Sequence, residues 1–169
     1  MDVIVAGAPG TDGAAPGVES LPLDVARDRH WETGGTYTLV CSLDREATLA
    51  VGALGEVTLP AGGYAYTGSA LGAGGYSRVD RHRRIAAGEH DVRHWHVDYL
   101  TGHPATTLRG VALAPDRDLE CAVARELGGG PVAGFGASDC DCETHLAGTP
   151  SAAAVERAVR SAYERLTDG

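Results

Sequence analysis

The sequence predicts an α+β domain in which a small antiparallel sheet is flanked by helices. Two observations support this prediction. Short segments rich in β-branched and aromatic residues lie between glycines in the stretch 35–68, which is typical of strands joined by tight turns. Segments with a helical pattern follow at 76–87, 119–127 and 151–166. Strands combined with flanking helices are typical of this fold class.

The strands are expected in the following order. A run of β-branched and aromatic residues predicts a strand over 36–41, and residues 47–51 and 56–59 bracket Gly52–Gly55 as a short hairpin. After a turn at 60–63, residues 64–68 read as a strand that ends at a glycine. A further strand is expected over 108–113, before Pro115. Residues 94–100 alternate polar and apolar side chains and fit either a strand or one helical turn.

Glycines and acidic caps mark the ends of the helices. The first helix is expected to stop at Gly88, and the second to be capped by Asp116 or Asp118 and to stop at Gly128. Residues 134–145 form a cysteine-bearing loop in this interpretation. The last helix is amphipathic, with its apolar residues near one face.

Three regions are predicted along the chain. Residues 1–33 are rich in Gly, Ala, Pro and Asp, and we expect a flexible acidic extension without regular structure. Residues 34–148 form the main domain, and 149–169 form a C-terminal helix packed on it. No apolar run approaches the roughly 20 residues needed to span a bilayer, and the N-terminus lacks the pattern of a signal peptide. These features favour a cytoplasmic protein.

The charge balance argues against a nucleic-acid partner, with one local exception. All 14 basic residues are arginine, there is no lysine, and 23 acidic residues give a net charge of −9. Phosphate binding usually requires clustered positive charge. An acidic, lysine-free surface suits the high-salt cytoplasm of a halophile, although a GC-rich genome would also favour arginine. Residues 78–84 nevertheless carry four arginines against one aspartate, which makes one face of one element basic.

The cysteines are expected to be thiols. Cys140 and Cys142 are too close in sequence for a comfortable mutual disulfide. Together with His145, and with Cys121 as a possible fourth ligand, they offer ligand types suited to Zn²⁺. The Cys-x-Cys spacing is tighter than in common zinc sites, so buried thiols are the alternative interpretation. Cys41, in a strand, is expected to belong to the core.

Several short motifs occur in a fixed order. They are Gly35-Thr36-Tyr37, Tyr66-Thr67-Gly68, Arg78 and His82 four residues apart on one helix face, and Glu120 opening a helix. In this order and spacing the chain resembles the GIY-YIG nucleases. Segments 68–72, 94–100 and 135–142 resemble the Uri-type branch of small endonucleases within that superfamily. The resemblance covers roughly residues 35–146.

The resemblance implies a metal-dependent endonuclease that hydrolyses phosphodiester bonds of DNA, with RNA as the alternative substrate. Glu120 would bind one Mg²⁺ or Mn²⁺ ion, which stabilises charge on the phosphate and the leaving oxygen, and Arg78 would stabilise phosphate charge. Tyr37 would take the proton of the attacking water, with its pKa lowered by the cation and the arginine. Tyr66 would position the water or a phosphate oxygen, and His82 would relay a proton or bind phosphate. The remaining expected substrate contacts are Gly68, Ser69, Arg81, Arg84, His94 and His96.

The chain departs from the family pattern at three points. Thr36 and Thr67 stand where the family has isoleucine, and both are expected to point away from the site. There is no asparagine in the chain to match the late asparagine of many members. Either Ser138 or Asp139 would replace it, or the rate of cleavage would be reduced. Two alternatives remain open: a non-catalytic nucleic-acid-binding module with the same fold, and a zinc-stabilised interaction domain. His94-x-His96-x-Asp98 could be a second metal site, a substrate contact or a structural cluster.

Overall fold

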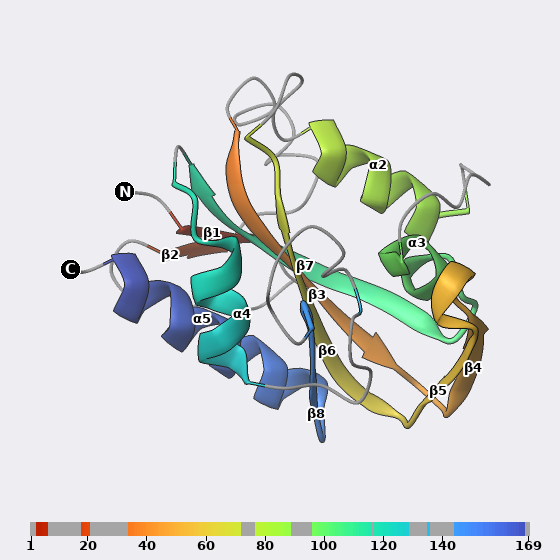
Figure 1. Cartoon of the computed structure of the whole chain (residues 1–169). Coiled ribbons are helices and arrows are strands. Elements are labelled where there is room, and N and C mark those ends of the chain that lie inside the picture. The colour runs from red at the N-terminus through yellow and green to blue at the C-terminus, as the bar shows by residue number, and fades with distance from the viewer. Residues whose placement is uncertain are drawn as a thin grey trace.

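A six-stranded sheet forms the centre of the molecule, in the strand order β2-β1-β7-β3-β6-β8 (Figure 1). The computed structural model describes residues 3–6, 18–20, 34–71, 77–88, 96–115, 117–128, 135 and 144–167. The strands of this sheet are β1 (Val3–Ala6), β2 (Val18–Ser20), β3 (Gly35–Leu43), β6 (Gly62–Ser69), β7 (Thr106–Pro115) and β8 (Leu146–Thr149). The predicted α+β class is confirmed.

The central strand β3 pairs antiparallel with both β6 and β7. Its register against β6 places Tyr37 directly opposite Gly68 and Leu39 opposite Tyr66. β8 continues the sheet antiparallel beyond β6. At the other edge β1 pairs antiparallel with β7, and β2 lies parallel to β1.

Helices cover both faces of the sheet. On one face lie α2 (Ser77–Ala86) and α3 (His96–Thr101), and on the other lie α4 (Glu120–Leu127) and α5 (Ala152–Thr167) (Figure 1). A separate hairpin of β4 (Ala47–Ala50) and β5 (Glu56–Leu59), with the 3₁₀ helix η1 (Gly52–Leu54) between them, lies beside α3. None of the helices that the structure describes is long and apolar enough to cross a membrane.

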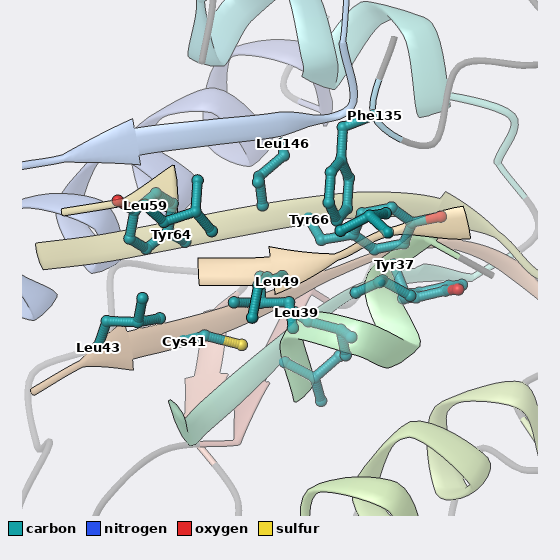
Figure 2. Packing of buried hydrophobic residues seen from close by; sticks show 14 of the residues in the cluster. Tyr37, Leu39, Cys41, Leu43, Leu49, Leu59, Tyr64, Tyr66, Phe135 and Leu146 are labelled. Carbon is teal, nitrogen blue, oxygen red and sulfur yellow. The ribbon is translucent and has the colours of Figure 1, made fainter. Parts of the chain in front are cut away.

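The alternation of side chains along the strands produces two cores. Tyr37, Leu39 and Tyr66 belong to the core on the α2–α3 face, where Phe135 packs against Tyr66 (Figure 2). Val40 and its neighbours on β6 and β7 pack beneath α5 on the other face. Since successive side chains of a strand point to opposite faces, the site tyrosine Tyr37 and its sequence neighbours Thr36 and Thr38 are separated by the sheet.

A buried hydroxyl network lies on the α5 face. Thr38 Oγ1 is 3.0 Å from Thr67 Oγ1 and 2.7 Å from the Tyr163 hydroxyl. These partners satisfy polar groups that would otherwise be costly to bury. Thr67 therefore points away from the tyrosine face, as the sequence predicted, and helps to attach α5 to the sheet.

The predicted element boundaries hold to within about two residues for β3, β6, β7, α2, α4 and α5. Strand β8 was not predicted, because its four residues follow the cysteine-bearing loop without a distinctive pattern. The segment that fitted either a strand or a helical turn is helical from His96. The expectation of no regular structure before residue 34 does not hold for β1 and β2, where Ile4, Val5 and Ala6 pair with β7 and extend the sheet.

The predicted aspartate cap of α4 is wrong. Asp118 is exposed, Asp116 lies outside the described residues, and the N-cap position is Leu119, without a capping side chain of its own. The backbone N–H of Leu119 donates instead to Thr36 Oγ1 from β3, at 2.7 Å. A hydroxyl distant in sequence thus holds the N-cap residue itself, through a contact that the local sequence does not supply.

Candidate active site

The candidate site lies at the end of the sheet where β3 begins and β6 ends. The backbones of Gly35 and Ala70 exchange two hydrogen bonds there, at 3.2 and 2.7 Å. Arg78 lies in the first turn of α2, and Glu120 opens α4. Both expected motif tyrosines project from neighbouring strands on one face, with ring centroids 6.5 Å apart (Figure 2).

The Tyr37 hydroxyl lies 2.8 Å from His82 Nε2, and both side chains are buried. The contact joins the first strand motif to the arginine helix α2. The rings also pack at a centroid distance of 5.5 Å. Tyr37 is therefore fixed in orientation by a hydrogen bond and by ring packing.

Gly68 provides the space that the Tyr37 ring occupies. A Cβ at position 68 would lie 2.5 Å from the Tyr37 oxygen and 2.6 Å from its Cζ. Such approaches are well inside van der Waals contact. Position 68 therefore requires glycine, because the Tyr37 ring lies directly over its backbone. This packing role is separate from the substrate contact that was expected of Gly68.

Asp98 anchors the arginine helix from α3. Its two carboxylate oxygens accept hydrogen bonds from Arg81 Nη1 and Nη2, at 3.0 and 2.8 Å, and the carboxylate is fully buried. Asp98 Oδ1 also lies 3.9 Å from His82 Nδ1. Arg81, expected at the substrate, is thereby held in a bidentate ion pair inside the protein.

Tyr66 lies in a ladder of aromatic rings. Its ring centroid is 6.3 Å from that of His82 and 6.2 Å from that of Phe135, which in turn lies 5.6 Å from His96. Such edge-to-face contacts restrict ring orientation. His96, an expected substrate contact, therefore packs against Phe135, which in turn packs against Tyr66. His96 and Asp98 lie two positions apart on the helix α3, so their side chains do not share a face. His94, the third residue of that pattern, lies outside the described residues.

Arg78 borders the site at the end of β6. Its Nη1 donates to the backbone carbonyl of Ser69 at 2.6 Å, and the residue is exposed. The bond fixes a permanent positive charge beside Gly68 and Tyr37. Arg84, the other expected substrate contact of α2, is also exposed.

Glu120 is positioned by Thr36. Besides accepting the bond from Leu119 N–H, Thr36 Oγ1 donates to the carbonyl of Arg117 at 2.8 Å. This fully buried side chain joins the start of β3 to the backbone that precedes Glu120. Thr36 does point away from the tyrosine face, as predicted, and its link to the start of α4 was not predicted.

Two further potential ligands lie beside Glu120. The ligand atoms of Glu120, Cys121 and His145 all lie within 4.8 Å of one another. His145 Nδ1 is 3.8 Å from Glu120 Oε2. Carboxylate, thiolate and imidazole are all metal ligands, so these residues fit a bound cation.

The charges of the site converge on Tyr37. Burial is the largest cause that raises the Tyr37 pKa well above 10; Tyr66, Glu120 and Asp98 raise it further, and Arg78 lowers it. These interactions mean that the expected site groups lie close enough to act on one phenol. The expected lowering of the pKa relied on a bound cation as well as on the arginine. Without a cation, burial outweighs Arg78, and Tyr37 is a neutral phenol at pH 7.

His82 is neutral as well. Burial lowers its pKa from 6.5 to about 3, although Asp98 acts in the opposite direction. A neutral imidazole can accept the hydroxyl proton of Tyr37 at Nε2 when its own proton is on Nδ1, toward Asp98. The arrangement can therefore work as a chain for moving one proton inward from Tyr37.

Sequence reasoning missed Asp98 as the residue that orients α2, and Thr36 as the link to Glu120. The sequence shows that Glu120 and Cys121 are consecutive in one helical turn. It does not show that His145 lies beside Glu120. His94, Ser138, Asp139, Cys140 and Cys142 lie outside the described residues. Of the four expected zinc ligands, Cys121 and His145 are among the described residues, and they lie together beside Glu120.

Comparison with known proteins identifies one family. A family model described as Domain of unknown function DUF123 matches residues 36–168, which is most of the chain. No curated protein and no solved structure matches the chain.

Proposed function

The chain belongs to DUF123, a GIY-YIG-like family, and we propose that it is a metal-dependent endonuclease of the Uri type that hydrolyses phosphodiester bonds in DNA. The observation that carries the proposal is the convergence of Tyr37, Tyr66, Arg78 and Glu120 on one end of the sheet. A phenol, a guanidinium and a carboxylate are the groups that phosphodiester hydrolysis needs.

Tyr37 is the proposed general base, acting together with His82. As the attacking water gives its proton to the Tyr37 oxygen, the hydroxyl proton of Tyr37 passes to His82 Nε2 across the 2.8 Å hydrogen bond. Asp98, at 3.9 Å from Nδ1, stabilises the resulting imidazolium. No free tyrosinate is then required, which is consistent with the raised pKa of the phenol.

Substrate binding makes this proton transfer more favourable. A phosphate beside the buried His82 raises the pKa of the imidazole, because negative charge favours its protonated form. A cation held by Glu120 would lower the pKa of Tyr37, because positive charge favours the ionised form of a phenol. Proton transfer from Tyr37 to His82 would therefore be favoured when substrate and cation are both bound. Without them, the phenol and the imidazole both stay neutral.

Arg78 is proposed to bind the phosphate being cleaved. The hydrogen bond to the Ser69 carbonyl holds its guanidinium beside the end of β6. Glu120 would hold one divalent cation, for which Mg²⁺ or Mn²⁺ is the expectation from sequence. When bound, the cation supplies charge stabilisation for the phosphate and the leaving oxygen.

Arg81 is proposed as a positioning residue. Its bidentate bond to Asp98 fastens α2 to α3 and holds the carboxylate near His82. Among the described side chains of this helix, the exposed Arg78 and Arg84 offer positive charge to DNA. With a net charge of −9, the protein should bind DNA through this local surface, and weakly.

A cleavage assay tests the proposal. The full chain is incubated in molar salt with single-stranded, duplex or branched DNA and Mg²⁺ or Mn²⁺. Matched controls replace exposed residues of the same types elsewhere, Arg157→Ala on α5 and Glu46→Gln before β4. We expect cleavage by the parent and both controls, and a loss of at least about 100-fold in Arg78→Ala and Glu120→Gln.

Two outcomes would overturn the assignment. Cleavage that survives in both site variants would locate the chemistry elsewhere. A folded parent that binds DNA, as measured by fluorescence anisotropy, but cleaves none of the substrates would identify a non-catalytic binding module. High salt is needed throughout, because self-repulsion of an acidic chain is strongest in dilute buffer.

A further inference from the structure

Three different metal ligands meet at the start of α4. Glu120 and Cys121 are consecutive residues in its first turn, and His145 directly precedes β8. Their ligand atoms lie within 4.8 Å of one another. The group therefore combines two elements that are separated in sequence but adjacent in the fold.

The backbone of each ligand is fixed independently of any ion. His145 N–H donates to the Phe135 carbonyl at 2.8 Å, and its own carbonyl accepts from Thr67 N–H at 3.0 Å. The start of α4 is held by the buried hydroxyl of Thr36. A site held this way needs little reorganisation when an ion binds.

The spacing fits ligands that share an ion. The 3.8 Å between His145 Nδ1 and Glu120 Oε2 is too long for a hydrogen bond. Two ligands at bond lengths of about 2.0–2.1 Å on a tetrahedral ion lie roughly 3.4 Å apart. A movement of a few tenths of an ångström would thus bring both onto one ion.

We propose that Glu120, Cys121 and His145 form a three-ligand site for Zn²⁺ or a similar late first-row transition ion. The inference rests on the proposed function in that Glu120 is also the ligand of the catalytic cation. Thiolate and imidazole favour such ions, whereas Mg²⁺ prefers oxygen ligands in octahedral geometry. Three protein ligands leave a fourth position open for water or a phosphate oxygen, which is the pattern of catalytic zinc sites.

The site differs from the zinc set inferred from sequence. That set used Cys140, Cys142 and His145, with Cys121 as an addition, and it had no carboxylate. The three-ligand site needs Cys121 and Glu120 and does not need the other two cysteines. Cysteine variants therefore distinguish the two.

Cobalt spectroscopy tests the site without DNA. The reduced, metal-stripped full chain is titrated with Co²⁺ in molar salt. A thiolate ligand gives an ultraviolet charge-transfer band, and four-coordinate Co²⁺ gives intense visible bands. We expect both, together with displacement by Zn²⁺ and not by an excess of Mg²⁺.

The variants define the ligands. We expect Cys121→Ser to abolish the charge-transfer band, and we expect His145→Ala and Glu120→Gln each to weaken Co²⁺ binding at least about tenfold. Cys41→Ala, in the core, and the double variant Cys140→Ala/Cys142→Ala should keep the band. Circular dichroism confirms that each variant is folded.

The outcomes separate this inference from the nuclease proposal. Absence of the band in the parent, or its persistence in Cys121→Ser, overturns the three-ligand site even if the protein cleaves DNA with Mg²⁺. Loss of the band only in the Cys140/Cys142 double variant assigns the metal to the sequence-derived set instead. A cobalt site without DNA cleavage in the presence of Mg²⁺, Mn²⁺ or Zn²⁺ supports the three-ligand site and removes the nuclease proposal alone.

Discussion

The hydroxyl of Tyr37 and the Nε2 atom of His82 lie 2.8 Å apart, although the residues are 45 positions apart in the chain. Both groups are shielded from solvent, and burial holds both in their neutral forms at pH 7. The pair is therefore a neutral, hydrogen-bonded phenol and imidazole, and it would ionise only when a charged substrate or cation binds beside it. This property leads to the first two predictions.

Replacing Tyr37 with phenylalanine is expected to abolish most cleavage while preserving the fold. The ring that packs over Gly68 remains, and only the proton-carrying oxygen is lost. General-base groups contribute about 10²–10⁴-fold in rate, so single-turnover DNA cleavage should fall by at least about 100-fold.

Tyr64→Phe is the matched control for that variant. Tyr64 lies in β6, and its hydroxyl donates to the carbonyl of Pro60. Its loss should cost about 1 kcal/mol of stability and leave the cleavage rate of the folded protein unchanged. Equal rates in Tyr37→Phe and the parent would exclude Tyr37 as the base.

His82 should make the protein less stable in acid. Its pKa is about 3 in the folded protein, against an ordinary value of 6.5, so the unfolded chain binds more protons between these values. The free energy of unfolding is therefore expected to fall as pH drops below 6.5, by about 2 kcal/mol at pH 5 from this residue. His145, whose pKa burial also lowers, acts in the same direction.

Denaturant unfolding at pH 7.5 and pH 5 measures this effect. The comparison is between the parent and His82→Gln, which retains a polar side chain but cannot titrate. The loss of stability between the two pH values should be smaller in the variant. An identical loss in both proteins would show that His82 is not held neutral by burial.

Gly68→Ala is expected to displace Tyr37. The added methyl carbon would lie 2.5 Å from the Tyr37 oxygen, and overpacking of this kind costs about 1–3 kcal/mol. Cleavage per folded molecule should fall nearly as far as in Tyr37→Phe, because the phenol can no longer meet His82. A thermally destabilised variant with a normal rate would contradict this account.

Thr36→Val is expected to misplace Glu120. Valine has the same shape but removes the acceptor for Leu119 N–H and the donor to the Arg117 carbonyl. We expect a loss of about 1–3 kcal/mol in stability and at least about tenfold weaker cation binding in the folded protein.

Two variants test whether Thr36 acts through Glu120. Thr36→Ser keeps the hydroxyl and should restore cation affinity. Thr38→Val removes a buried hydroxyl from the same face of the same strand, where it contacts Thr67 and Tyr163. It should be destabilised comparably yet keep the parental affinity, as measured by titration with Co²⁺.

The sequence by itself determined most of the helices and strands between residues 35 and 166, but not β1, β2 or β8. The β-branched and aromatic run over residues 36–41 predicted a strand, and the ordered tyrosines, glycines and arginines predicted which residues would share a site. Given the antiparallel register in which Tyr37 lies opposite Gly68, the alternation of side chains along each strand places both tyrosines on one face of the sheet. These features depend on spacing along one or two adjacent segments, and local periodicity records such spacing.

Only the tertiary structure decided which distant side chains meet. Nothing in local spacing indicates that Asp98 binds Arg81, that Thr36 anchors the start of α4, or that His145 approaches Glu120. The alternating pattern around His96 fitted a strand as well as a helical turn, and the chain is helical there. These contacts depend on the order of the strands and on which face each helix covers, because packing of whole elements, and not sequence distance, sets the separation of their side chains.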